Sequence, residues 1–195
     1  MKAVLFFCHI SMSFDICARF GVYCLHRVLM PHANGGINMA YSQPIAEMLR
    51  GFFTVSGISA VFEEKPSCGL FTLRMKLRCR LQTAQMLVIV REDNYSTLTT
   101  IPLAADENSR LAVAEYLTRA NFNMRNGNFE LNMETGEIRF KTYVHVGAGQ
   151  PDIAAARLAV MLPFFTLDRF GDGLLEVLFG FKSPREAFEA VERQK

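Results

Sequence analysis

The chain has 195 residues, of which 50% are hydrophobic and 21% are charged, so it can bury one core but is too short for two domains of ordinary size. This composition excludes disorder as a description of the whole chain. The net charge of +2 comes from the first 38 residues, because the remainder has 18 basic and 18 acidic side chains. A neutral domain lacks the electrostatic field that non-specific nucleic-acid binding requires.

An apolar run near the start of the chain does not have the pattern of a membrane segment. It extends from Ala3 to Phe14, contains His9 and stops at Asp15, well short of the roughly twenty apolar residues that a spanning helix needs. No small-residue cleavage site of a secretory signal follows it. We therefore expect neither secretion nor a membrane anchor, and a cytoplasmic location.

Residues 1–40 nevertheless differ from the rest of the chain. The turn-forming cluster Pro31–Asn38 closes them, and the first segment with a regular pattern begins just after Met39. We expect translation to start at Met39 or at Met30, which makes residues 1–40 a mis-annotated leader. The alternative is a genuine but disordered N-terminal extension. Residues 41–195 are then the folded domain.

Cysteine and histidine are sparse in this domain. Only Cys68 and Cys79 lie outside the first forty residues, which is not a disulfide framework and fits a reducing compartment. His145 is the single histidine of the domain, and neither cysteine has a second ligand two to four residues away. We therefore expect no metal site, no cofactor and no Cys–His nucleophile.

Helix and strand patterns follow each other in the first half of the domain. Pro44 fits the first turn of a helix over Gln43–Val55, which Gly57 ends before a short strand at Ile58–Phe62. A strand with one buried face is predicted over Leu70–Leu81, because apolar and polar residues alternate without exception from Phe71 onwards. Two more strands are expected to complete an antiparallel meander, at Met86–Val90 and Tyr95–Ile101.

The second half begins with a helix and a hairpin. Capping residues predict a helix over Asp106–Ala120. Its expected inward stripe is Leu111, Ala114 and Leu117. The hairpin joins strands at Phe129–Leu131 and Ile138–Val146, with Gly136 as the left-handed residue of the turn.

The last two predicted elements are a strongly apolar helix and a short final helix. Pro151–Phe170 is apolar almost all round, so we expect this helix in the core or at a subunit interface, and on that ground a homodimer. Gly171 to Gly173 lacks the context of a phosphate loop and is interpreted as a helix break. A capping box at Ser183 begins a helix through Val191. The predicted fold class is α+β, a twisted antiparallel sheet with helices packed on it.

The stretch from Ala120 to Val146 resembles the signature region of the YbjN family. In that family a helix runs into an Asn-containing turn, a Gly-x-Phe-Glu strand, an acidic turn with Gly, and a Glu-Ile/Val-Arg-Phe/Tyr strand. The order of helices and strands over most of Tyr41–Lys195 is similar too. The matching positions are Asn121, Gly127, Phe129, Glu130, Gly136, Glu137, Ile138, Arg139 and Phe140.

This resemblance implies a fold like that of the type III secretion chaperones, commonly dimeric, in a bacterial family described as sensory-transduction regulators. No catalytic residues are defined for the family, so none can be carried over to this chain. Likeness of fold alone does not license a function.

Six basic residues on predicted strand faces are the candidate partner-binding site. A basic face of this kind suits an acidic peptide or a nucleic acid. The alternative is a solvated face whose cations pair with Glu on neighbouring strands, which is the commoner outcome for surface charges. The six are Arg74, Lys76, Arg78, Arg80, Arg139 and Lys141.

Three function classes follow, in decreasing order of support. The first is a non-enzymatic, chaperone-like or regulatory module that holds a segment of a protein partner, in an apolar groove or by strand addition at a sheet edge. The second is binding of nucleic acid or another anionic ligand by the basic strand faces, which the neutral charge of the domain disfavours. An enzyme ranks last, because the sequence displays no paired acid–base groups.

Overall fold

The structure is a computed structural model that describes residues 40–122 and 124–193. The predicted extension over residues 1–40, with both candidate start residues, lies outside this part except for residue 40. Within the described ranges, no helix is both long and apolar enough to cross a membrane.

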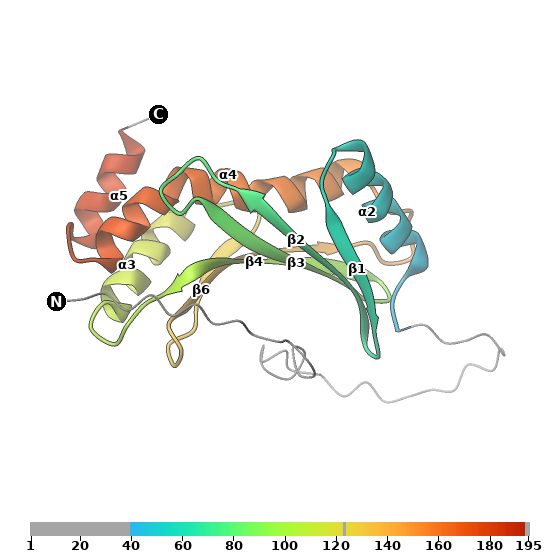
Figure 1. Cartoon of the computed structure of the whole chain (residues 1–195), viewed down its shortest axis with the longest axis horizontal. Helices are drawn as coiled ribbons and strands as arrows, with labels where there is room; N and C mark the ends of the chain where they lie inside the picture. Colours follow the sequence, from blue (N-terminus) through green and yellow to red (C-terminus); the bar gives the residue numbers. More distant parts are fainter. Residues whose placement is uncertain (1–39, 123, 194–195) are drawn as a thin grey trace. The chain divides into compact units, whose positions relative to one another are not determined.

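The described residues form one α+β unit with a single antiparallel sheet, which confirms the predicted fold class (Figure 1). The strand order across the sheet is β1-β2-β3-β4-β6-β5. The predicted central strand over Met86–Val90 is part of β3, which has a neighbour on each side. The elements are α2 (Gln43–Val55), β1 (Ala60–Lys65), β2 (Cys68–Lys76), β3 (Thr83–Val90), β4 (Asn94–Ala104), α3 (Arg110–Asn121), β5 (Asn128–Leu131), β6 (Glu137–His145), α4 (Ile153–Leu178) and α5 (Pro184–Glu192).

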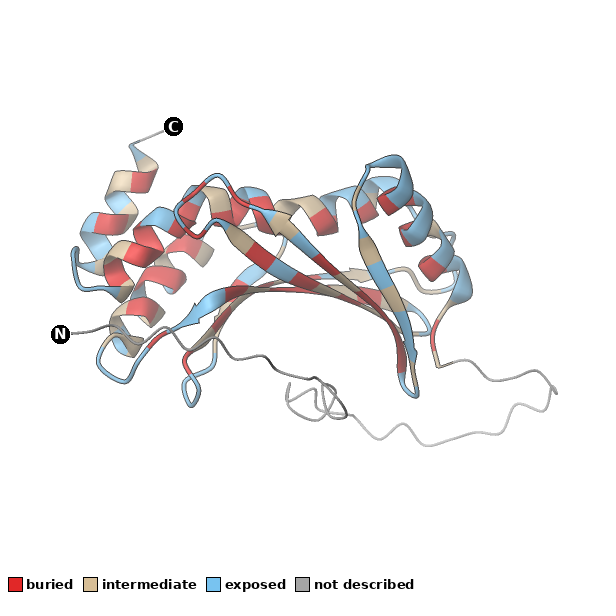
Figure 2. Cartoon of the chain, in the orientation of Figure 1, coloured by how far each residue is buried: buried red, intermediate tan, exposed pale blue. Residues whose placement is uncertain are grey.

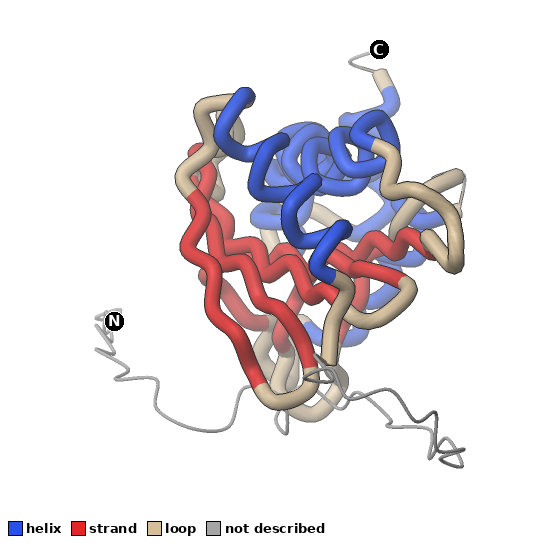
Figure 3. The backbone as a smooth tube through the Cα atoms, turned by 90° about the vertical axis from the view of Figure 1, so that its right-hand side faces the viewer, coloured by secondary structure: helices blue, strands red, loops and turns tan. Residues whose placement is uncertain are grey.

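The helices of this unit gather on one side of the strands, and α4 lies on β4 and β6 (Figure 3). Strand residues that face the helices are buried, as the bands in Figure 2 show for alternate positions. Three buried threonines, Thr97, Thr99 and Thr142, interrupt this apolar face. The hydroxyls of Thr97 and Thr142 share a hydrogen bond of 2.8 Å, and Thr142 also donates to the carbonyl of Ala159 in α4 at 3.1 Å. The hydroxyls of Thr97 and Thr142 are therefore satisfied, whereas the hydroxyl of Thr99 has no hydrogen-bond partner among the described residues.

Helix α2 begins and ends where the sequence predicts. The side chain of Ser42 accepts a hydrogen bond from the backbone of Ile45, and Gly57 leaves the helix with a left-handed φ of 65°. Its inner face places Phe53 against Phe71 of β2, with ring centroids 5.3 Å apart. Burying one such ring contributes about 1.5–3 kcal/mol. The strand after this helix is displaced towards the C-terminus, because a tight turn pairs Lys65 with Cys68.

The strand predicted over Leu70–Leu81 ends early, at Lys76. The chain then forms a loop over residues 77–82, the β2–β3 loop, in which Gln82 has a left-handed φ of 63°. Three apolar residues of this loop stay buried because the loop packs against α4: Leu77, Cys79 and Leu81. The alternation therefore predicted burial correctly and the length of the strand wrongly.

Helix α3 begins at Arg110 rather than at Asp106, and its predicted inward stripe is correct only at Leu117. The buried residues are Val113, Tyr116, Leu117 and Ala120, whereas Leu111 is 75% exposed. Both sets of residues recur at helical spacing, so the partner decides between them. Here the buried hydroxyl of Tyr116 donates to the carbonyl of Phe170 in α4, which selects the face that contains Tyr116.

The hairpin of β5 and β6 matches its prediction. Gly136 has φ 74°, and a Cβ atom there would collide with the carbonyl of Ala105, so the turn requires glycine.

Helix α4 continues to Leu178, so the interpretation of Gly171 to Gly173 as a helix break is wrong. Both glycines are sites of close approach. A Cβ at Gly171 would lie 2.7 Å from Sγ of Cys79, and one at Gly173 would collide with the Tyr116 hydroxyl. The capping box at Ser183 is present and begins α5.

Candidate functional site

The six predicted binding residues lie in three separate places. Two are exposed or half-buried on each of β2 and β6, on the face away from the helices, and two lie in the β2–β3 loop. Arg74 and Lys76 are on β2, Arg139 and Lys141 are on β6, and Arg78 and Arg80 are in the loop. The expectation that four of them share one strand face is wrong, because β2 ends before the last two.

The β2 pair and the β6 pair are not neighbours. The register places Arg74 beside Gln85 of β3, Gln85 beside Thr100 of β4, and Thr100 beside Arg139 of β6. Arg74 and Arg139 are therefore three strands apart, about 14 Å at the usual strand spacing. The predicted basic residues do not form a continuous platform.

Several of these cations already have acidic partners. Nε of Arg139 lies 2.7 Å from Glu130 of β5, and Nζ of Lys141 lies 3.4 Å from the other oxygen of the same carboxylate. Arg80 donates to Glu176 at 2.9 Å. On β6 and in the β2–β3 loop, the alternative of a solvated face with paired charges therefore describes the arrangement well.

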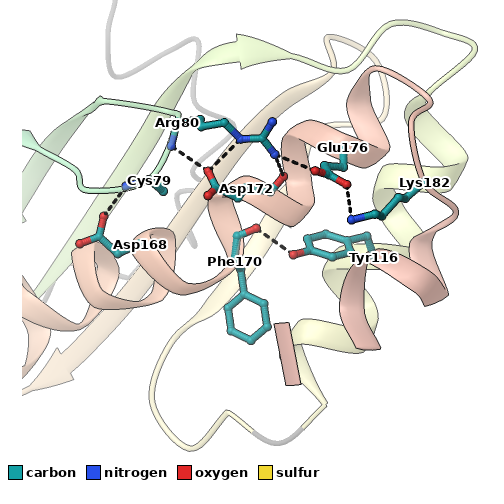
Figure 4. A network of polar contacts seen from close by, with 8 residues as sticks. All are labelled: Cys79, Arg80, Tyr116, Asp168, Phe170, Asp172, Glu176 and Lys182. Carbon is teal, nitrogen blue, oxygen red and sulfur yellow. Dashed lines mark hydrogen bonds and ion pairs between the residues drawn. The ribbon is translucent and has the colours of Figure 1, made fainter. Parts of the chain in front are cut away.

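A ladder of three acids on α4, spaced four residues apart, holds the β2–β3 loop (Figure 4). Oδ1 of Asp168 accepts a hydrogen bond from the backbone N–H of Arg78 at 2.6 Å, and Oδ1 of Asp172 accepts one from the backbone N–H of Arg80 at 2.7 Å. Backbone groups that lost their strand partners at the end of β2 thus bind carboxylates instead.

Glu176 completes this acidic ladder. It accepts from Arg80 and lies 2.6 Å from Nζ of Lys182. The hydrogen bond from Lys182, followed by that from Arg80, lowers the pKa of the Glu176 carboxyl. Every acid of the ladder is thus engaged with this chain itself, so we interpret the ladder as a clasp that fixes the loop.

Both cysteines of residues 40–193 are buried. Cys79 lies beneath the clasp, and burial raises the pKa of its thiol, which disfavours the reactive thiolate. Cys68 is buried as well. In the part of the chain that the structure describes, no three His, Cys, Asp or Glu side chains are grouped as ligands for a metal ion.

An unpaired strand edge lies near the other end of α4. Strand β5 pairs with β6 only as far as Lys141. Successive residues of an antiparallel strand direct their backbone groups to opposite neighbours, and the N–H of Val146 donates to the Asp93 carbonyl, on the β4 side, at 2.9 Å. Tyr143 and His145 therefore direct N–H and C=O to the side where β5 is missing. Among residues 40–122 and 124–193, neither has a backbone partner there.

A hollow of about 460 Å³ runs along this open edge of β6 (residues 142–145). Small and aliphatic residues of α4 form its floor, and the chain just before β5 forms its outer wall. Three lining side chains are basic and none is acidic. The floor contains Ala155, Leu158, Ala159 and Leu162, the wall contains Arg125, Asn126 and Gly127, and the three basic residues are Arg125, Lys141 and His145.

The outermost strands β5 and β1 carry side-chain caps and charges, although β2 also extends past its partner β1 over residues 74–76. The side chain of Asn121 accepts from the N–H of Phe129 at 2.8 Å and donates to its C=O at 3.0 Å, so it occupies the outer edge of β5 as a paired strand would. Edge strand β1 carries charged residues at its end, and the hydroxyl of Tyr41 donates to Glu64 there at 2.7 Å. Charges and side-chain caps are common protections against unwanted pairing. The described residues provide no such cap along the open edge of β6.

Sequence reasoning did not find this edge. The signal that could have found it is the unequal length of the hairpin strands, because β6 has nine residues and β5 has only four. A strand that is longer than its outer neighbour must leave backbone groups unpaired unless another element covers them.

A second hollow, of about 420 Å³, lies between α3, α4 and α5. It is rich in apolar side chains, among them Met124, Phe165 and Phe188. Its charged rim is already neutralised, since Arg169 lies 2.5 Å from Glu192. It contains no unpaired strand edge, so we regard it as the weaker site.

Comparison with known proteins adds no identification at this point. Neither the protein-family models nor the curated proteins that were searched contain a match to this chain. The resemblance to the YbjN family therefore stays a prediction.

Proposed function

We propose that the protein is a non-enzymatic, chaperone-like module that binds an extended segment of another protein by strand addition. The observation that carries this proposal is the open edge of β6, where unpaired backbone groups lie beside an apolar floor. In strand addition the backbone hydrogen bonds supply affinity, and pockets for alternate side chains supply selectivity. The resemblance to the YbjN family supports the same class of function.

The geometry defines how a guest strand would lie. It would continue the line of β5 and pair with Tyr143 and His145 through its backbone. Guest residues opposite Thr142 and Val144 would point towards α4, because these two residues lie on the helix-facing side of β6. The guest would therefore bury every second side chain against the floor of the hollow.

Two other expectations remain proposals with less support. The apolar surplus of α4 favoured a homodimer, but 13 of its 26 residues are buried within the single chain. Light scattering of the full chain distinguishes a monomer of 22.0 kDa from twice that mass. Nucleic-acid binding has less support because the basic residues of β2 and β6 do not form one continuous surface. We keep the cytoplasm as the proposed location.

The test compares Tyr143→Pro with Tyr143→Val. The N–H of Tyr143 points away from β4, so proline there removes a donor at the edge without breaking a bond in the sheet. Valine keeps the donor and retains β propensity. Each variant is used as bait for affinity purification from the native host, with partners quantified by mass spectrometry.

Strand addition predicts a partner that wild type and Tyr143→Val retain and Tyr143→Pro loses. Hydrogen exchange of the Tyr143 and His145 amides should slow in the complex, because the guest occupies their outward-facing backbone groups. Recovery of bare protein from all three baits, or of the same partners with all three, would overturn the proposal.

A further inference from the structure

We infer that the segment bound at the open edge alternates acidic with aliphatic residues, an inference that rests on the proposed strand addition. A guest strand has two rows of side chains, one on each face of the sheet. The surroundings of the two rows differ at this edge, and that difference defines the chemistry of the guest.

The row that faces α4 meets small and aliphatic side chains of the helix, together with Thr142 of β6. The floor of the hollow is built from Ala155, Leu158, Ala159 and Leu162, with Val144 of β6 beside them. Leu158 is 49% exposed, so a side chain placed over it removes apolar surface from water. A charged guest residue in this row would lose its hydration without a partner. The row that faces α4 therefore selects aliphatic side chains.

The opposite row meets basic side chains. Lys141 and His145 belong to the face of β6 away from the helices, and Arg125 stands on the wall of the hollow. The ammonium group of Lys141 lies 3.4 Å from Glu130, which also pairs with Arg139, and the ring of His145 lies 4.0 Å from Asp93. Arg125 has no ion pair among the described residues. Acidic guest residues would complement these groups, whereas basic ones would be repelled.

A second copy of this chain is the competing occupant, through its own edge strand β1. That strand has two acidic residues, but both are already engaged. Glu63 lies 2.5 Å from Lys65, and Glu64 accepts a hydrogen bond from Tyr41. The two also point to opposite faces of the sheet because they are adjacent. The acid requirement of the basic row is therefore met better by a segment of a different protein.

The experiment uses the full chain and fluorescein-labelled ten-residue peptides, read by fluorescence anisotropy. The first peptide alternates Glu with Leu, and the second alternates Lys with Leu. A third has the composition of the first, with its Glu and Leu residues in two blocks. We expect the first to bind about tenfold more tightly than either of the others, because only it places acids along one row and aliphatic side chains along the other. Its affinity should fall as salt is added.

Matched variants locate the charge requirement. Arg125→Glu should weaken binding of the Glu-Leu peptide about tenfold and improve binding of the Lys-Leu peptide, since the nearest unpaired cation becomes an anion. Arg74→Glu is the control, because it makes the same exchange at an exposed arginine three strands away from Arg139. It should change affinity less than twofold. Equal melting temperatures of the three proteins show that both variants fold.

The outcomes separate the inference from the function on which it rests. If all three peptides bind equally and Tyr143→Pro abolishes binding, the acidic pattern is wrong and strand addition stands. If the Glu-Leu peptide binds Tyr143→Pro as tightly as wild type, or no peptide of any pattern binds, strand addition at this edge is wrong as well. If the chain self-associates and the peptide dissociates that assembly, the occupant is a second copy and the inference is overturned.

Discussion

The two halves of α4 are built for opposite purposes. Towards its C-terminus the helix is tied to its neighbours: the β2–β3 loop binds its acidic ladder, and the Tyr116 hydroxyl donates to its backbone beside Gly173. Towards its N-terminus the helix borders a hollow and a strand edge without a partner. We call these the clasped end and the open end.

The difference teaches where this molecule keeps its free binding capacity. At the clasped end, polar groups that left the sheet are satisfied by acids of α4, so these groups already have partners within the chain. At the open end, backbone groups of the sheet itself remain unpaired. A binding module of this kind needs a rigid scaffold and unpaired backbone groups at the binding edge. Rigidity helps because a site that must become ordered on binding loses affinity.

The largest effect is expected at the glycine of the clasped end. Gly173→Ala forces a Cβ into the Tyr116 hydroxyl and should lower the free energy of unfolding by about 3 kcal/mol through overpacking. Gly51→Ala in α2 is the control, since a Cβ there has no atom within 4 Å. That variant should gain about 1 kcal/mol from helix propensity. Urea denaturation measures both values, and two gains of similar size would show that the clasped end is not tightly packed.

Loss of one ladder acid should have the next largest effect. Asp168→Ala removes the acceptor of the Arg78 and Cys79 backbone N–H groups and should cost about 2 kcal/mol. Amide hydrogen exchange of residues 78–80 should accelerate with it. Glu107→Ala, at an exposed position before α3, should stay within about 0.5 kcal/mol of wild type. Unchanged exchange in the loop would contradict the clasp.

Two buried tyrosines offer a sharper contrast. Tyr116→Phe loses the hydrogen bond of 2.8 Å to Phe170 and should cost about 1 kcal/mol. Tyr95 is as deeply buried, yet its hydroxyl has no hydrogen-bond partner among the described residues. Tyr95→Phe should therefore be neutral or stabilising by about 0.5 kcal/mol. Equal losses in thermal melts of the two variants would show that Tyr95 is in fact bonded.

The same pair predicts a response to alkali. Burial raises the pKa of Tyr95 to about 12 from an ordinary value of 10.0. A group with a raised pKa contributes its full stability below the unfolded value and loses it as the pH climbs through the folded value. Stability of the wild type should therefore fall between pH 10 and 12, and Tyr95→Phe should fall less steeply over that interval.

The smallest effect on stability is expected at the open end. Leu158→Glu changes a side chain that is 49% exposed, so the free energy of unfolding should move by less than about 0.5 kcal/mol. Binding of the Glu-Leu peptide should nevertheless be lost, because the floor of the hollow becomes charged. A large loss of stability in urea would mean that Leu158 belongs to the core.

Helix α2 was predicted with the correct bounds because its ends are determined locally. Ser42 and Pro44 begin it and Gly57 leaves it, all within two residues of the ends. The face of α3 was not predictable in the same way. Leu111 and Val113 both lie on plausible stripes, and only a hydrogen bond to a residue 54 positions away selects between them.

The candidate site escaped prediction for a related reason. The end of β2 depends on Asp168, which is 90 positions from Arg78 in the sequence. That distant contact takes Arg78 and Arg80 off the predicted strand face. The open edge depends instead on the early end of β5, and the backbone partners of a strand are a property of the assembled sheet. Its unequal length was readable, but the hollow beside it was not.

The position of Asn128 has a consequence for the size of any guest. Between this first residue of β5 and the glycine at position 147, a guest can pair only along residues 142–145 of β6. These four residues span about 13 Å at the usual rise per residue. A guest that extends farther meets the first residue of β5 at one end and passes the end of β6 at the other. The position of β5 therefore limits the length of guest that can pair, and peptides trimmed to the pairing residues should keep nearly all the affinity of longer ones.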